Sequence, residues 1–159
     1  MKRKQTSGID QDLILQKIRH FCSYQERYIR EVEEKLKDWT IQRQMIPGII
    51  TSLQQEGFLN EERFVKAFSG GKFRLNKWGR QKIAFELKLR GISESTIPVG
   101  LAEIDENEYR KTLKNLILRK QSETASEKKL TARSKIVNFV AGKGYEMNLI
   151  LEIMNELQF

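Results

Sequence analysis

The sequence is short of the residues that build metal sites and disulfides. Its 159 residues include one cysteine, Cys22, and one histidine, His20. One cysteine cannot form a disulfide within the chain, and a four-ligand zinc site would need two carboxylates that no spacing places beside these two residues. We therefore expect no structural metal, no cofactor and a reducing, cytoplasmic compartment.

Long apolar runs are also missing. No run approaches the roughly 18 apolar residues that a membrane-spanning helix needs. The first residues, from Met1 to Thr6, are basic and polar, and they lack the apolar stretch of a secretion signal. We expect no membrane association, and we interpret residues 1–9 as a flexible basic arm.

Helical periodicity is what the sequence has instead. Apolar residues recur three and four positions apart along most of the chain, as in Ile14, Ile18, Phe21 and Cys22, and no stretch sustains period-two alternation. Helix-end signals separate these stripes, among them a capping box from Ser23 to Glu26 and an Asn60 cap. Gly57, Gly91 and Gly144 each follow an apolar stripe, where the left-handed residue after a helix is expected. Pro47 and Pro98 fall at early helix positions, which tolerate proline. The pattern predicts eight or nine short helices and an all-α fold.

A repeat of about 50 residues organises these helices. The segment Arg80-Gln81-Lys82-Ile83, followed by Arg90-Gly91-Ile92, realigns on Arg133-Ser134-Lys135-Ile136, followed by Lys143-Gly144-Tyr145, after a shift of 53 residues. Upstream, Leu36-Lys37-Asp38-Trp39 resembles the same unit, with Asp38 where the glycine stands. Such a period predicts three tandem three-helix modules stacked into an elongated helical-repeat protein. We place the modules at residues 10–59, 60–105 and 106–159.

Positive charge is concentrated in the middle module. The formal net charge is +8, and residues 64–91 contain eight basic residues against one acidic residue, Glu86. A local patch of this kind favours a polyanion, most simply nucleic acid, because each phosphate contact releases counterions. The candidate contact residues are Lys72, Arg74, Lys77, Arg80, Lys82, Lys88 and Arg90.

Local spacing gives a first expectation of how these cations are arranged. We expect a helix from Trp78 onward, with Lys77 and Arg80 on one face of it and Lys72, Arg74 and Lys77 in the connection before it. Trp78 could stack on a base, but a tryptophan among apolar helix positions is more often part of a core.

Two motifs resemble a known family. The stretch Gly57-Phe58-Leu59-Asn60-Glu61-Glu62-Arg63-Phe64 and the basic helix from Gly79 to Ile92 are similar to the RecX family of bacterial recombinase regulators, over roughly residues 10–159. The departures are Asn60, where the family prefers aspartate, and Asp38, where it usually has glycine.

The resemblance implies a function. Proteins of this family bind the helical filament that RecA forms on single-stranded DNA, and they inhibit its ATPase, strand exchange and coprotease activities without catalytic residues of their own. We expect a monomer that binds single-stranded DNA only weakly by itself. On capping rules alone, however, the Gly57 to Phe64 stretch is also a complete helix-to-helix corner.

Three alternatives stay open at this point. One is a stand-alone DNA-binding regulator of the helix-turn-helix kind, although no helix start clusters the Asn, Gln and Arg residues that read bases. Another is an enzyme acting on nucleic acid, for which the sequence offers no paired carboxylates at metal-site spacing. The third is a helical adaptor whose charge only favours solubility.

Overall fold

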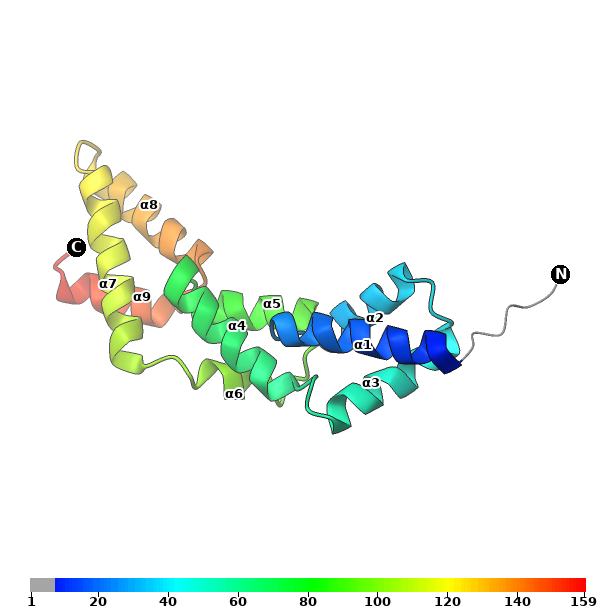
Figure 1. The fold of residues 1–159 in the computed structure, drawn as a ribbon. Coiled ribbons are helices and arrows are strands. Elements are labelled where there is room, and N and C mark those ends of the chain that lie inside the picture. The colour runs from blue at the N-terminus through cyan, green and yellow to red at the C-terminus, as the bar shows by residue number, and fades with distance from the viewer. Residues whose placement is uncertain (1–7) are drawn as a thin grey trace. The chain divides into compact units, whose positions relative to one another are not determined.

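The computed structural model describes residues 8–159, and within that range every regular element is a helix (Figure 1). This confirms the predicted all-α fold and the number of helices. The basic residues of the predicted N-terminal arm lie outside the described residues. In chain order the elements are α1 (Gly8–Tyr24), α2 (Ile29–Asp38), a 3-10 turn (Arg43–Met45), α3 (Ile46–Gln55), α4 (Glu61–Asn76), α5 (Arg80–Leu89), α6 (Ile97–Leu101), α7 (Glu106–Glu123), α8 (Lys129–Gly142) and α9 (Met147–Glu156).

The helices form two compact units that meet within α4, the first ending at Phe64 and the second covering Val65–Phe159. In the first unit, α1, α2 and α3 bury one shared cluster. Ile18 of α1, Leu36 of α2 and Leu53 of α3 are completely buried in it. None of the helices described is long and apolar enough to span a bilayer.

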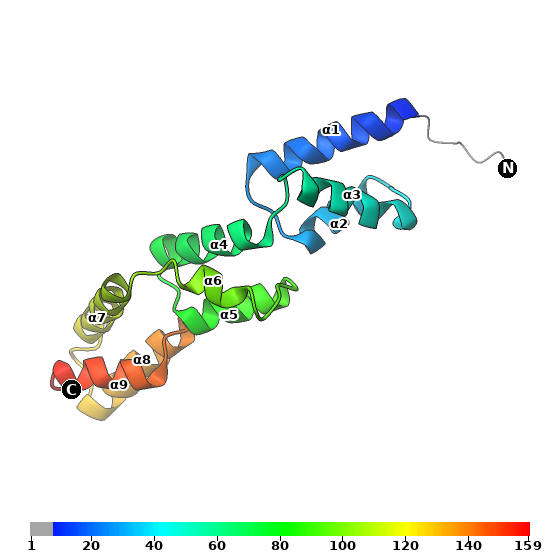
Figure 2. The same ribbon diagram turned by 90° about the horizontal axis from the view of Figure 1, so that it is seen from below.

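The second unit contains both later modules. Helices α7 and α8 lie side by side, and α9 packs against both of them (Figures 1 and 2). Its completely buried apolar side chains come from α4, α5, α7, α8 and α9, and they include Val65, Ile83, Leu113, Ile136 and Ile150. Several of these helices are too short to be stable by themselves, so the core they share is what stabilises them.

Helix α4 is longer than the sequence indicated. It runs through Gly70 and Gly71, although each glycine costs up to about 1 kcal/mol in a helix interior. Helix α6 packs so closely on it that a Cβ atom at Gly100 would lie 2.5 Å from the backbone oxygen of Val65. Beyond the two glycines, Phe73 is buried with its ring centroid 5.8 Å from that of Tyr109. The expectation that Lys72 and Arg74 lie in a connection is therefore wrong, because both residues lie in α4.

Two of the expected helix-end signals have different outcomes. The Asn60 cap is confirmed, because its Oδ1 accepts a hydrogen bond of 2.9 Å from the Arg63 backbone N–H. The capping box at Ser23 is wrong, since Ser23 lies inside α1 and donates to the Arg19 carbonyl oxygen. Its expected partner Glu26 instead accepts a hydrogen bond of 2.9 Å from Arg63 Nε.

The Gly57 to Phe64 motif forms a corner between helices. Gly57 has φ of 78°, and its carbonyl oxygen accepts a hydrogen bond of 2.8 Å from Arg63 Nη1. Phe64 is buried, and its ring centroid lies 5.2 Å from that of Tyr28. Gly57, Asn60, Arg63 and Phe64 thus each have an intramolecular role, which favours the structural interpretation over a docking site.

The second helix of each module, which is α2, α5 or α8, ends in the same way. This corrects the alignment of the first module with the other two. Gly91 and Gly144 have φ of 79° and 98°, and the residue after each donates to a carbonyl five positions earlier. Thr40, with φ of 58°, holds the equivalent place, since Ile41 N donates to Leu36 O. The glycine position of the first module is therefore Thr40 and not Asp38.

Thr40→Gly should stabilise the first unit by about 1 kcal/mol, because a β-branched residue is strained at positive φ and glycine is not. Urea unfolding followed through Trp39 fluorescence, in a Trp78→Phe background, measures the change. Thr40→Ala is the matched control and should change the free energy of unfolding much less. Equal stability of the glycine and threonine proteins would contradict the strain at this position.

Candidate functional site

The basic segment spans the end of α4, a short connection and α5. Lys72 and Arg74 lie on the last turns of α4, and Lys77 lies in the connection with φ of 59°. Helix α5 begins at Arg80, two residues later than expected, so Lys77 and Arg80 do not share a helix face. Lys82 and Lys88 lie on α5, and Arg90 follows its last residue.

The half-buried Trp78 brings two lysines together. The Nζ atoms of Lys72 and Lys82 lie 4.9 and 4.6 Å from the centre of its ring. An ammonium group over an indole face is attracted by about 0.5–1 kcal/mol at an exposed site. Because both lysines already lie against the ring, Trp78 is better suited to position these cations than to stack on a base.

The C-terminal end of α4 gathers two further cations. Lys77 Nζ donates a hydrogen bond of 2.8 Å to the Arg74 carbonyl oxygen, and both side chains are exposed. The last carbonyl groups of a helix carry partial negative charge, which stabilises nearby cations. This interaction holds Lys77 beside Arg74 without neutralising either charge.

Lys143, from the third module, adds a cation that the sequence analysis missed. Its Nζ donates a hydrogen bond of 3.1 Å to the Asn76 carbonyl oxygen, also at the end of α4. A signal existed in the repeat, because Lys143 aligns with the candidate Arg90. The compositional window of residues 64–91 excluded it.

A backbone clasp between the modules fixes Lys143 in this place. Its carbonyl oxygen accepts from Gly79 N at 2.8 Å, and the Gly144 carbonyl oxygen accepts from Gln81 N at 2.9 Å. These bonds satisfy amide groups at the start of α5 that have no partner within that helix. The Tyr145 hydroxyl donates to the Lys77 carbonyl oxygen at 2.9 Å and closes the clasp.

Arg80 belongs to an internal network instead. Its guanidinium pairs with Glu106 and with Glu146, and it lies 3.9 Å from the centre of the Tyr109 ring. Burial raises the pKa of the Tyr109 hydroxyl well above its ordinary value. The hydroxyl therefore stays protonated and donates to Glu146 at 2.8 Å, so we assign Arg80 to joining the modules.

The last two candidate cations also have acidic neighbours. Arg90 pairs with Glu86 at 2.8 Å and lies over the Phe68 ring. Lys88 Nζ is 3.3 Å from Glu94, although both side chains are exposed and such pairs contribute at most about 1 kcal/mol. Their positive charge is thus partly compensated.

Five cations remain, and we call them with Trp78 the Trp78 surface. Their side chains are exposed or half-buried and have no ion pair within residues 8–159. The five are Lys72, Arg74, Lys77, Lys82 and Lys143. Over the same range, no three His, Cys, Asp or Glu side chains are placed to hold a metal ion. What the arrangement can do chemically is bind anionic groups.

Comparison with known proteins shows a similarity to one family. Residues 60–97 match the family description "RecX, second three-helix domain". "Regulatory protein RecX" of Clostridium acetobutylicum is 26% identical over 132 residues, which cover 80% of this chain and 61% of that protein. The protein of the same name in Bacillus subtilis is 27% identical over 141 residues, covering 87% of this chain and 53% of its own. The chain is similar to RecX proteins over most of its length, and to the second RecX domain over residues 60–97.

Solved structures of RecX proteins agree in fold with this chain. The crystal structure of RecX from Lactobacillus salivarius superposes with a TM-score of 0.82 at 21% identity and covers 91% of this chain and 94% of its own. A second structure, described as that of regulatory protein RecX, has a TM-score of 0.81 at 18% identity. The match covers 98% of this chain and 80% of the other. The matches with the two curated RecX proteins span 61% and 53% of their lengths. The region that matches the RecX domain contains four of the five cations of the Trp78 surface, and Lys143 lies outside it.

Proposed function

We propose that this protein binds RecA filaments on single-stranded DNA and inhibits their ATPase, strand exchange and coprotease activities. The observation that carries the proposal is the Trp78 surface, where cations from two modules converge in a chain that is similar to RecX proteins. A filament of protein on DNA offers both phosphates and acidic side chains to such a surface. The protein would act by binding, as a monomer in the cytoplasm, where RecA meets chromosomal DNA.

The charge of the Trp78 surface sets the expected strength of this binding. Single-stranded DNA releases about 0.7 counterions for each phosphate neutralised, so five cations give a slope of about −3.5 in log affinity against log salt. Naked DNA should therefore bind weakly at physiological salt. On a filament, weak contacts from successive modules add up through effective concentration, and no single residue need dominate.

The proposal predicts inhibition of RecA at low stoichiometry. The protein is titrated into pre-formed filaments of the recombinase from the same cell, and DNA-dependent ATP hydrolysis is measured. We expect the rate of ATP hydrolysis to fall while the protein is still present at well below one molecule per RecA subunit. The reason is that filament disassembly or blocked growth affects many subunits at once.

The control is the double variant Lys111→Glu with Lys114→Glu, which reverses two exposed charges on α7 and should inhibit as the unmodified protein does. Full ATPase activity at saturating protein, with retained DNA binding, would contradict the proposal. It would favour the stand-alone DNA-binding protein.

A further inference from the structure

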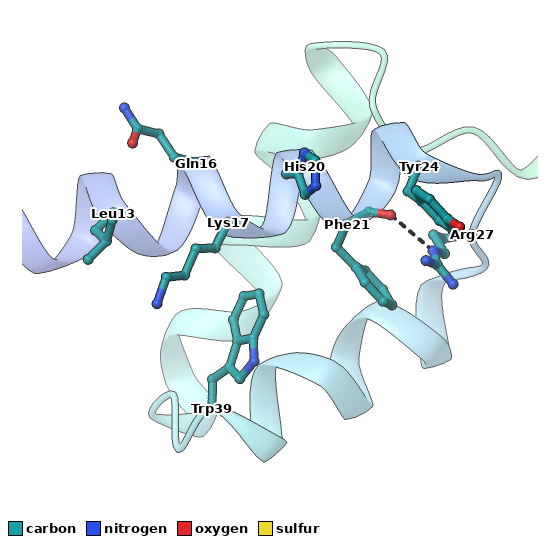
Figure 3. A pocket seen from close by; sticks show the side chains of 8 residues that line it. All are labelled: Leu13, Gln16, Lys17, His20, Phe21, Tyr24, Arg27 and Trp39. Atoms are coloured by element: carbon teal, nitrogen blue, oxygen red, sulfur yellow. Dashed lines mark hydrogen bonds between the residues drawn. The ribbon is translucent and has the colours of Figure 1, made fainter.

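A groove on the first unit has no part in the function proposed above. It has a volume of about 480 Å³ and lies between one face of α1 and the end of α2 (Figure 3). In Figure 3 the Trp39 ring lies between the Lys17 and Phe21 side chains of α1. The residues of this groove that matter here are Leu13, Lys17, Phe21, Tyr24, Arg27 and Trp39.

Two apolar side chains beside the groove are unusually exposed. Tyr24 is 79% exposed and Leu13 is 49% exposed, although the same helix buries Ile18 and Cys22 in the core of the unit. Neither exposed residue is needed for that core. Exposed apolar side chains along an apolar groove are typical of an interaction site.

The charged side chains that line the groove have one sign. Lys17 lines it, and Lys35 Nζ lies 5.4 Å from the centre of the Phe21 ring. Neither lysine has an ion pair among the described residues. The other cation, Arg27, is satisfied internally, because it donates to the Phe21 carbonyl oxygen and pairs with Glu31 at 2.8 Å. No carboxylate stands among the described residues that line the groove.

We propose that this groove binds an acidic peptide segment of a protein partner, with one bulky apolar side chain of the peptide against Phe21 and Trp39 and the rest of the segment along α1 between Leu13 and Tyr24. Carboxylates on either side of that anchor would meet Lys17 and Lys35. An apolar anchor in a pocket supplies most of the affinity of such contacts, and the charges supply specificity. A nucleic acid fits less well, because its affinity depends on many phosphate contacts and the groove offers two uncompensated ammonium groups.

Three synthetic peptides test the proposal on the full-length chain, by fluorescence anisotropy of a label on the peptide. The first carries several Asp and Glu residues around one Phe and one Leu. The second replaces the acidic residues by Asn and Gln, and the third replaces Phe and Leu by Ser. We expect the first to bind at least about 10-fold more tightly than either of the others.

Variants locate the site. Tyr24→Ser and Lys17→Glu should each weaken binding of the first peptide at least about 5-fold, because they remove an apolar wall and reverse a charge. Both residues are exposed, so circular dichroism should be unchanged. Arg43→Glu is the matched control, since Arg43 is exposed in the same unit and outside the groove, and it should have little effect.

The outcomes separate this proposal from the proposed action on RecA. Arg74→Glu with Lys77→Glu should leave peptide binding intact, while Tyr24→Ser should leave the affinity for single-stranded DNA intact. Equal binding of the three peptides, or peptide binding that is insensitive to Tyr24→Ser, would overturn the proposal. So would an oligonucleotide whose binding is lost in Tyr24→Ser, because the groove would then be a nucleic-acid site.

Discussion

Arg74→Glu combined with Lys77→Glu is expected to lower the affinity for single-stranded DNA by about 30- to 100-fold at low salt. Each reversal removes one phosphate contact and adds a repulsive charge, and both side chains are exposed at the end of α4. The slope of log affinity against log salt should change by about 1.4, since each contact on a single strand contributes about 0.7. Anisotropy titrations with a labelled oligonucleotide at several salt concentrations measure both quantities.

The same variant should raise the protein concentration that half-inhibits RecA at least about 10-fold. The α7 double variant Lys111→Glu with Lys114→Glu has the same change in net charge and should stay within about 3-fold of the unmodified protein. An unchanged salt slope in the α4 variant, or equal losses in both variants, would remove the Trp78 surface from the proposed function. Equal losses would indicate that only net charge matters.

Gly79→Ala is expected to destabilise the second unit by about 3 kcal/mol, which is the upper end of the usual cost of overpacking. A Cβ atom at this position would lie 2.3 Å from the Gly144 carbonyl carbon and 2.4 Å from Tyr145 N. These are backbone atoms, so the clasp between α5 and the α8–α9 turn would have to open. Its hydrogen bonds from Gly79 N and Gln81 N would be lost.

Thermal unfolding should show a fall of about 10–20 °C in the transition of this unit. Gly142→Ala is the matched control, because Gly142 is the last residue of α8 and a Cβ placed there has room. Apart from its chain neighbours and the backbone of its own helix, no atom lies within 4 Å of it. Its stability should be unchanged or slightly raised. A Gly79→Ala protein as stable as the unmodified one would show that the modules are not clasped through these backbone atoms.

The clasp also links stability to the candidate site. It holds the Lys143 backbone against the start of α5, while the Lys143 side chain reaches the end of α4. Opening it should therefore weaken DNA binding through loss of one cation, even where the rest of the unit stays folded. Lys143→Ala, which removes the cation and keeps the clasp, separates the two effects.

Local signals in the sequence were enough for much of the fold. The three-and-four spacing of apolar residues predicted the helices, and the glycines at 57, 91 and 144 predicted where three of them end. These signals work because helix periodicity and left-handed backbone geometry depend on residues close in sequence. They failed inside α4, where Gly70 and Gly71 favour a break and the helix nevertheless continues to Asn76, with Phe73 buried against Tyr109.

The composition of the sequence by itself determined that the middle module is basic, and the tertiary structure decided which of its charges are available. Arg80 is compensated by Glu106 and Glu146, which lie 26 and 66 residues further along the chain. Lys143 belongs to the Trp78 surface because its side chain contacts the Asn76 carbonyl oxygen, although the two residues are 67 positions apart in the sequence. The strength of an ion pair depends on distances between side chains, and for residues so far apart in sequence these distances are set by how the modules pack.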